Sequence, residues 1–142
     1  EALTMGIPIH APKFESDLLK PFYEGLAAGE LRLTVDSETG GWAWYPPEMV
    51  PGRPAAALEW RTASSEGTVY SFTRVERSLL PGDHRAEVPF TVVLFEPDDA
   101  PGCRVPGLFV AGEEVSAACG MRARLSPVRA GDHVVAGFAP IG

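Results

Sequence analysis

Short apolar segments separated by turns make up the chain from residue 58 onward, and this pattern is the strongest constraint on its fold. Five segments have the alternation, or the β-branched and aromatic content, that is typical of strands. They are 67–77 together with the preceding 58–62, then 88–96, 105–111, 121–126 and 133–139. The segment 58–77 is predicted to be one long bent strand. The segment 88–96 should be a central strand because it is apolar on both faces. The segment 105–111 should be an edge or bulged strand because Pro106 and Gly107 interrupt it.

One or two helical turns are expected between the third and fourth strands. Residues 112–120 carry Glu113 and Glu114 ahead of Val115, and Gly120 can close the turns. Five strands with a helix in this position match the order of an OB-fold barrel, although SH3-like barrels and half-sandwiches share the strand count.

The N-terminal part is predicted to be helical after an extended arm at 1–13. An apolar stripe with helical spacing runs through 14–29, Ser16 can cap it, and Pro21 should divide it into two short helices that end at Gly29. Residues 31–35 alternate as a half-buried strand. The expected organisation is an arm with helices at 1–30, a segment of turns and aromatics at 31–56, and the barrel domain at 57–142.

Charge and composition limit the classes of function. The net charge of −7 disfavours binding to nucleic acid, and no apolar run approaches the roughly 20 residues of a membrane span. No signal peptide is expected, and the two cysteines, Cys103 and Cys119, lack paired spacing. Such cysteine usage fits a reducing compartment, so the expected location is the cytoplasm.

Catalytic constellations are missing from the sequence. It contains no nucleophile elbow, no phosphate-binding glycine loop and no paired metal-ligand spacing. Asp83–His84 and Asp132–His133 join a carboxylate to an imidazole, but neighbours in a turn are more often exposed to water. We favour a structural role for both cysteines, and we assign no catalytic or metal-binding residue.

An ordered set of segments resembles the family called domain of unknown function 35 (DUF35). The segments that carry this resemblance are 21–26 (PFYEGL), 29–31 (GEL), 42–47 (WAWYPP), 58–60 (LEW), 67–73 (GTVYSFT), 88–90 (VPF) and 119–121 (CGM). Together they span roughly residues 20–140. The resemblance implies N-terminal helices, a rubredoxin-like zinc ribbon and an OB-fold associated with acyl-CoA metabolism.

The chain departs from that family in the ribbon. The positions that correspond to the zinc ligands hold Asp36, Thr39, Pro51 and Pro54. Structural zinc is normally held by four thiolate or imidazole donors, so this set cannot hold it. We expect a degenerate, metal-free ribbon in which aromatic packing and prolines keep 42–54 ordered.

The resemblance also implies a partner. Members of the family accompany thiolase-superfamily enzymes that act on CoA thioesters, which here suggests an accessory subunit of an aldolase of steroid side-chain degradation. The chain itself would bind no cofactor, and the CoA thioester would be the substrate of the hetero-oligomer. The alternatives are a free-standing OB-fold that binds single-stranded nucleic acid and an independent acyl-CoA hydrolase.

Two groups of residues are candidates for these roles. The candidate partner interface consists of five aromatic residues: Phe22, Tyr23, Trp42, Trp44 and Tyr45. The alternative is that these side chains form the local core of the helix and the ribbon segment. The candidate contacts to CoA phosphates are Arg74, Arg77 and Arg85, with a second group at Arg122, Arg124 and Arg129. Arginines on strands more often form a solvated face.

Overall fold

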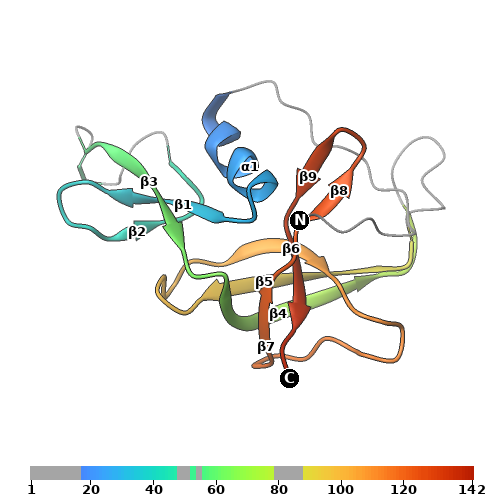
Figure 1. Ribbon diagram of the computed structural model, residues 1–142. Helices are drawn as coiled ribbons and strands as arrows, with labels where there is room; N and C mark the ends of the chain where they lie inside the picture. Colours follow the sequence, from blue (N-terminus) through green and yellow to red (C-terminus); the bar gives the residue numbers. More distant parts are fainter. Residues whose placement is uncertain (1–16, 48–51, 54–55, 79–87) are drawn as a thin grey trace.

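The structure is a computed structural model that describes residues 17–47, 52–53, 56–78 and 88–142. It contains a short helical region, a small three-stranded sheet, a closed five-stranded barrel and a separate hairpin (Figure 1). Within these residues no helix has the length and hydrophobicity that a membrane span requires.

The predicted helical region is confirmed as one short α-helix preceded by a 3-10 turn, whereas the predicted cap Ser16 lies outside the described residues. A 3-10 turn, η1 (Asp17–Leu19), leads into α1 (Lys20–Ala27), and Pro21 lies in the first turn of α1. Proline suits this position because its missing N–H would have no partner there. The chain leaves the helix through Gly29, whose φ of 79° suits glycine. Phe22 and Leu26 form the buried face of α1.

The small sheet consists of β1 (Leu31–Asp36), β2 (Trp42–Ala43) and β3 (Leu58–Ala63), in the antiparallel order β2-β1-β3. Leu31, Leu33 and Val35 of β1 are fully buried. The predicted strand at 31–35 is therefore confirmed, but it is more than half-buried, because Thr34 is buried as well. That this sheet derives from a zinc ribbon stays a prediction.

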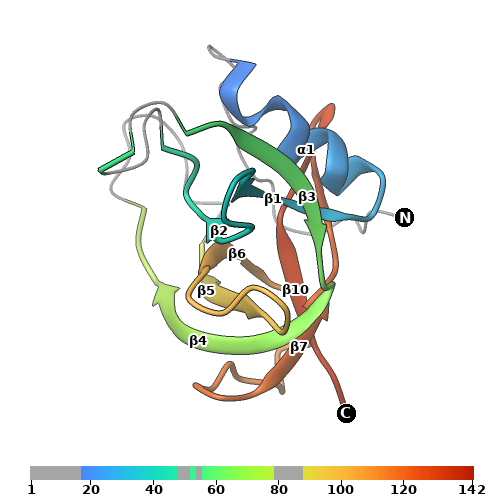
Figure 2. The ribbon, with the colours of Figure 1, turned by 90° about the vertical axis from the view of Figure 1, so that its left-hand side faces the viewer.

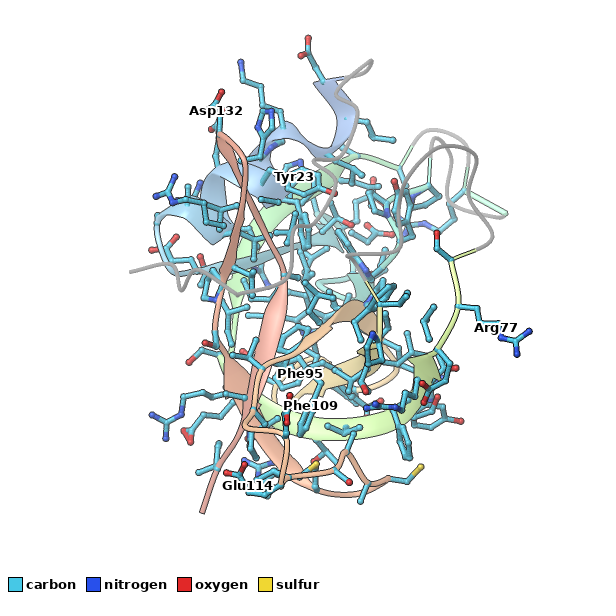
Figure 3. All side chains as sticks on the ribbon, turned by 90° about the vertical axis from the view of Figure 1, so that its right-hand side faces the viewer. Tyr23, Arg77, Phe95, Phe109, Glu114 and Asp132 are labelled. Atoms are coloured by element: carbon cyan, nitrogen blue, oxygen red, sulfur yellow. The ribbon has the colours of Figure 1, made fainter. Side chains whose placement is uncertain are left out.

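The barrel consists of β4 (Glu66–Val75), β5 (Phe90–Pro97), β6 (Val105–Phe109), β7 (Arg122–Leu125) and β10 (Gly137–Pro140). It closes in the order β10-β6-β5-β4-β7, with β10 parallel to β6. The Phe95 and Phe138 rings stack in its core with centroids 4.2 Å apart. Figure 3 shows Phe95 and Phe109 inside the barrel. The mainly β, five-stranded OB-fold prediction is confirmed.

Two strand predictions need correction because the chain changes sheet within them. The segment 58–77 is divided at residues 64–65, so that β3 pairs with β1 while β4 joins the barrel (Figure 2). The segment 133–139 is divided at Ala136. Its first part, β9 (His133–Val135), forms a hairpin with β8 (Val128–Ala130), and its second part is β10.

The edge prediction for 105–111 is wrong, since β6 lies between β5 and β10. Gly107 allows the ring of Phe138 to pack closely against β6, because a Cβ at this position would overlap with that ring. The helical turns predicted at 112–120 are also wrong: the segment has isolated turns at 113–114 and 119–120 and is otherwise irregular. Residues 111–116 are exposed, so a helix here would have had almost no apolar face to bury.

Candidate functional site

The predicted aromatic residues gather where α1, the small sheet and the barrel meet. The Phe22 ring stacks on Trp44 at 4.9 Å and meets Tyr23 edge-on at 5.1 Å. Trp44 also contacts Tyr45 at 5.4 Å and Trp60 of β3 at 6.2 Å, measured between ring centroids. Aromatic pairs at these separations add stability beyond the area they bury. The cluster therefore joins the helix to the small sheet.

Burial separates structural members of this cluster from a surface member. Phe22 is buried, while Tyr23, Trp42 and Trp44 are half-buried. The side chain of Tyr45 is 59% exposed. Burial raises the pKa of Tyr23, and the electrostatic effect of the Tyr45 phenol raises it further. Four of the five candidates thus pack within the chain, and Tyr45 presents its ring to the outside.

An apolar cavity of about 320 Å³ opens beside the cluster. Tyr23, Trp44 and Tyr45 line it on one side. Val92 of β5 and Leu108 of β6 line it on the barrel side. The volume lies at the lower end of the range for ligand pockets, and the wall is almost entirely apolar. We call this the aromatic cavity; it suits an apolar side chain or a small apolar group.

Asp36 and Arg53, which the sequence did not single out as a pair, form an ion pair at the end of the small sheet. Arg53 also contacts the carboxylate of Glu38. The Asp36 carboxylate accepts hydrogen bonds from the backbone N–H groups of Glu38 and Thr39. These interactions lower the pKa of Asp36. The hydrogen bond from the backbone N–H of Glu38 has the largest effect, and the positive charge of Arg53 also contributes.

The Asp36–Arg53 ion pair lies in the part of the sequence where the DUF35 resemblance places zinc ligands. Asp36 stands at the first position that the DUF35 resemblance assigns to a zinc ligand, and Arg53 stands between the last two, Pro51 and Pro54. The two prolines lie outside the described residues. Among the residues that the structure describes, no three potential metal ligands gather. The Arg53–Asp36 ion pair and two hydrogen bonds from Ser37 to the carbonyl oxygen of Ala57 connect the two segments.

The candidate phosphate-binding arginines that the structure describes are exposed or held in ion pairs. Arg74 is exposed and forms an ion pair with Glu76, with Nε 2.5 Å from Oε1. Arg77 is exposed and points away from the body of the protein (Figure 3), and Arg85 lies outside the described residues. In the second group, Arg122 is held in a two-bond pair with Asp98 at 2.6 and 2.7 Å. Arg124 and Arg129 are exposed on β7 and β8.

The residues considered for nucleophilic chemistry are placed unfavourably for it. Cys103 is buried and lies against the backbone of Trp44. Burial raises the pKa of the Cys103 thiol, and the charge of Glu96 raises it further. Cys119 is exposed in a turn, and Asp132 and His133 lie at the exposed tip of the β8–β9 hairpin. His10 and Asp83–His84 fall outside the described residues.

Sequence reasoning missed Arg53 and Trp60. Arg53 and Asp36 are 17 residues apart, and no periodic signal connects them. Trp60 was placed on a strand, but its contact with Trp44 depends on β3 pairing with β1. Only the pairing of β3 with the small sheet reveals this contact.

Comparison with known proteins agrees with the fold. The chain is similar in structure to a protein described as "Ltp2-ChsH2(DUF35) aldolase", with a TM-score of 0.75 and 18% identity over 91% of this chain and 98% of that chain. It is also similar to a DUF35 protein of unknown function from Sulfolobus solfataricus, with a TM-score of 0.60 and 12% identity over 91% and 89% of the two chains. No curated protein sequence matches the chain.

A family model gives the identification. The model described as "ChsH2, C-terminal OB-fold domain" matches residues 60–136, which is more than half of the chain and includes β4 through β9. The matched region holds four of the five barrel strands, and β10 completes the barrel directly after it. The chain therefore belongs to the DUF35-type family of ChsH2 C-terminal OB-fold domains.

Proposed function

We propose that this chain is a non-catalytic accessory subunit or domain that binds and supports a thiolase-superfamily enzyme acting on CoA thioesters. The observation that carries the proposal is the family match over residues 60–136, because the ChsH2 protein with this fold is described as part of an aldolase together with Ltp2. We further propose that the partner cleaves carbon–carbon bonds in steroid side chains and that the partner supplies the catalytic groups.

The aromatic cavity and Tyr45 support a role in binding another protein. Exposed aromatic rings beside an apolar hollow are typical of residues that dominate the energy of interfaces. Tyr45 exposes 59% of its side chain and borders the aromatic cavity. In this proposal the partner inserts an apolar side chain into the cavity, and Tyr45 covers it.

The placement of charge supports the same proposal over nucleic-acid binding. Most arginines of the described residues are paired with carboxylates, which reduces the charge they can offer to a phosphate backbone. The ion pairs are Arg32–Glu30, Arg53–Asp36, Arg74–Glu76, Arg104–Glu96 and Arg122–Asp98. For a contact to the CoA phosphates, the exposed Arg77 is the better candidate than Arg74, whose charge Glu76 already partners.

Co-expression tests this function. The thiolase-like enzyme encoded beside the gene of this chain should co-elute with it, and the pair should cleave a steroid-CoA β-hydroxy thioester by a retro-aldol reaction. Each protein alone should give little or no turnover. If the enzyme is equally soluble and active without this chain, the proposal fails.

A further inference from the structure

The positions at which the DUF35 resemblance places zinc ligands hold a poor set of donors in this chain. The resemblance places the ligands in two pairs, at 36 and 39 and at 51 and 54. Asp36 and Thr39 each offer side-chain oxygen, whereas the side chains of Pro51 and Pro54 carry no donor atom. A structural zinc site is almost always tetrahedral, with thiolates and imidazoles as the usual ligands. Two oxygen-bearing side chains are therefore too few to complete it.

The two oxygen-bearing side chains are also engaged in the turn that follows β1. Oδ1 of Asp36 accepts hydrogen bonds from the backbone N–H groups of Glu38 at 2.9 Å and Thr39 at 3.4 Å. The Thr39 hydroxyl accepts the backbone N–H of Gly41 at 3.2 Å. Backbone hydrogen bonds of 2.7 and 2.8 Å between Asp36 and residues 40–41 close the same turn. The turn is thus held by its own hydrogen bonds, and the residues present do not fit a zinc ion.

A cation that belongs to the chain lies at the second pair of positions. Arg53 stands in the sequence between Pro51 and Pro54. Its Nη1 donates to Oδ2 of Asp36, the carboxylate oxygen that the turn leaves free, and its Nη2 donates to the carboxylate of Glu38. Asp36 and Glu38 precede Arg53 by 17 and 15 residues. One guanidinium therefore joins the two segments that a zinc ion joins in the family.

Burial makes the Asp36 end of this bridge the more important one. The side chain of Asp36 is 8% exposed, that of Arg53 is 32% exposed and that of Glu38 is 72% exposed. A carboxylate removed from water needs a counter-charge or hydrogen bonds, and Asp36 has both. The exposed Glu38 contributes little energy by itself, but it fixes the plane of the guanidinium. A lysine ammonium lacks the planar geometry that lets one side chain bridge two carboxylates in this way.

We propose that the Arg53 guanidinium performs the structural role that zinc performs in the family which this chain resembles. The small sheet is closed by a cation that is part of the chain, so it needs no metal ion. The bridge requires arginine at position 53, because Asp36 and Glu38 are bound by two different nitrogens of the same group. The inference does not depend on the partner under "Proposed function", since every contact lies within this chain.

Elemental analysis and thermal unfolding test the independence from metal. The chain purified without added metal should contain far less than one equivalent of zinc. Its unfolding temperature should stay within about 1 °C when EDTA or equimolar zinc chloride is added, because a metal that binds the folded state would shift it. One equivalent of zinc that copurifies with the chain would overturn the inference. So would an unfolding temperature that falls on addition of EDTA.

Arg53→Lys tests the need for a guanidinium, since it keeps the positive charge and removes the planar group. The unfolding temperature should fall by about 3 °C or more. Arg61→Lys is the matched control, at an exposed position of β3 that forms no ion pair with any described residue. This control should change the unfolding temperature by less than about 1 °C. In a Glu38→Gln background, Arg53→Lys should have a smaller effect, because the second carboxylate is gone. Equal effects at positions 53 and 61 would overturn the inference.

Discussion

Arg53 forms an ion pair with the buried carboxylate of Asp36 and so connects the two loops at the end of the small sheet. The family resemblance places a zinc ligand at Asp36 and two more at the sequence positions on either side of Arg53. A salt bridge in this position can hold the loops together only as long as both partners keep their charge. The stability of the small sheet should therefore depend on charge and on pH.

Removing Arg53 should loosen the small sheet. In Arg53→Met, Asp36 keeps its backbone hydrogen bonds but loses its counter-charge, so the unfolding temperature should fall by a few degrees. Thermal unfolding followed by tryptophan fluorescence measures this, because Trp42 and Trp44 lie in or beside the sheet. Arg32→Met removes a more exposed ion pair with Glu30 and should have a smaller effect. Equal effects of the two substitutions would contradict a special role for Arg53.

The pH dependence follows from the lowered pKa of Asp36. A carboxyl group whose folded-state pKa lies below its unfolded value of about 3.9 stabilises the protein above that value. This stabilisation is lost as the pH falls through the folded-state pKa. The gap in unfolding temperature between wild type and Asp36→Asn should thus be full at neutral pH and should close in acid. A gap that stays constant down to low pH would show that the charge of Asp36 contributes nothing.

The sequence predicted the elements whose residues repeat with a regular period. The stripe on α1 and the alternation of β1 needed no tertiary information. The wrong predictions concern segments whose structure is determined by contacts between residues far apart in the sequence. β6 looked like an edge because of Pro106 and Gly107, yet Gly107 is needed for the approach of Phe138 across the barrel. The Asp36–Arg53 pair depends on which segments become neighbours in the folded chain, and local patterns do not encode this.

Two glycines should respond differently to the same substitution. A Cβ on Gly67 would overlap with the carbonyl oxygen of Glu96 in the adjacent strand, which is backbone and cannot move aside. Gly67→Ala should therefore destabilise the barrel by about 1–3 kcal/mol in urea unfolding. Gly112→Ala would meet only the mobile carboxylate end of Glu114 and should lose less than about 0.5 kcal/mol. Similar losses in both variants would show that the β4–β5 contact can relax.

The two cysteines should differ in reactivity. Cys119 is exposed, whereas Cys103 is buried and burial raises the pKa of its thiol. Since the thiolate is the reactive species, a thiol reagent at neutral pH should label Cys119 quickly and Cys103 only when the fold opens. Mass spectrometry of wild type and Cys119→Ser measures both phases. Rapid labelling of the Cys119→Ser variant would contradict the packing of Cys103 against the small sheet.

Trp44 and Tyr45 are neighbours with opposite expected roles. Trp44 contacts three other rings, so Trp44→Ala should destabilise the chain by about 2–3 kcal/mol. Tyr45 exposes most of its ring, so Tyr45→Ala should cost less than about 1 kcal/mol of stability while weakening binding of the thiolase-like enzyme by about tenfold. Urea unfolding and calorimetric titration measure the two effects separately. If Tyr45→Ala leaves the affinity unchanged, the aromatic cavity is internal packing only, and the partner must dock elsewhere on the barrel.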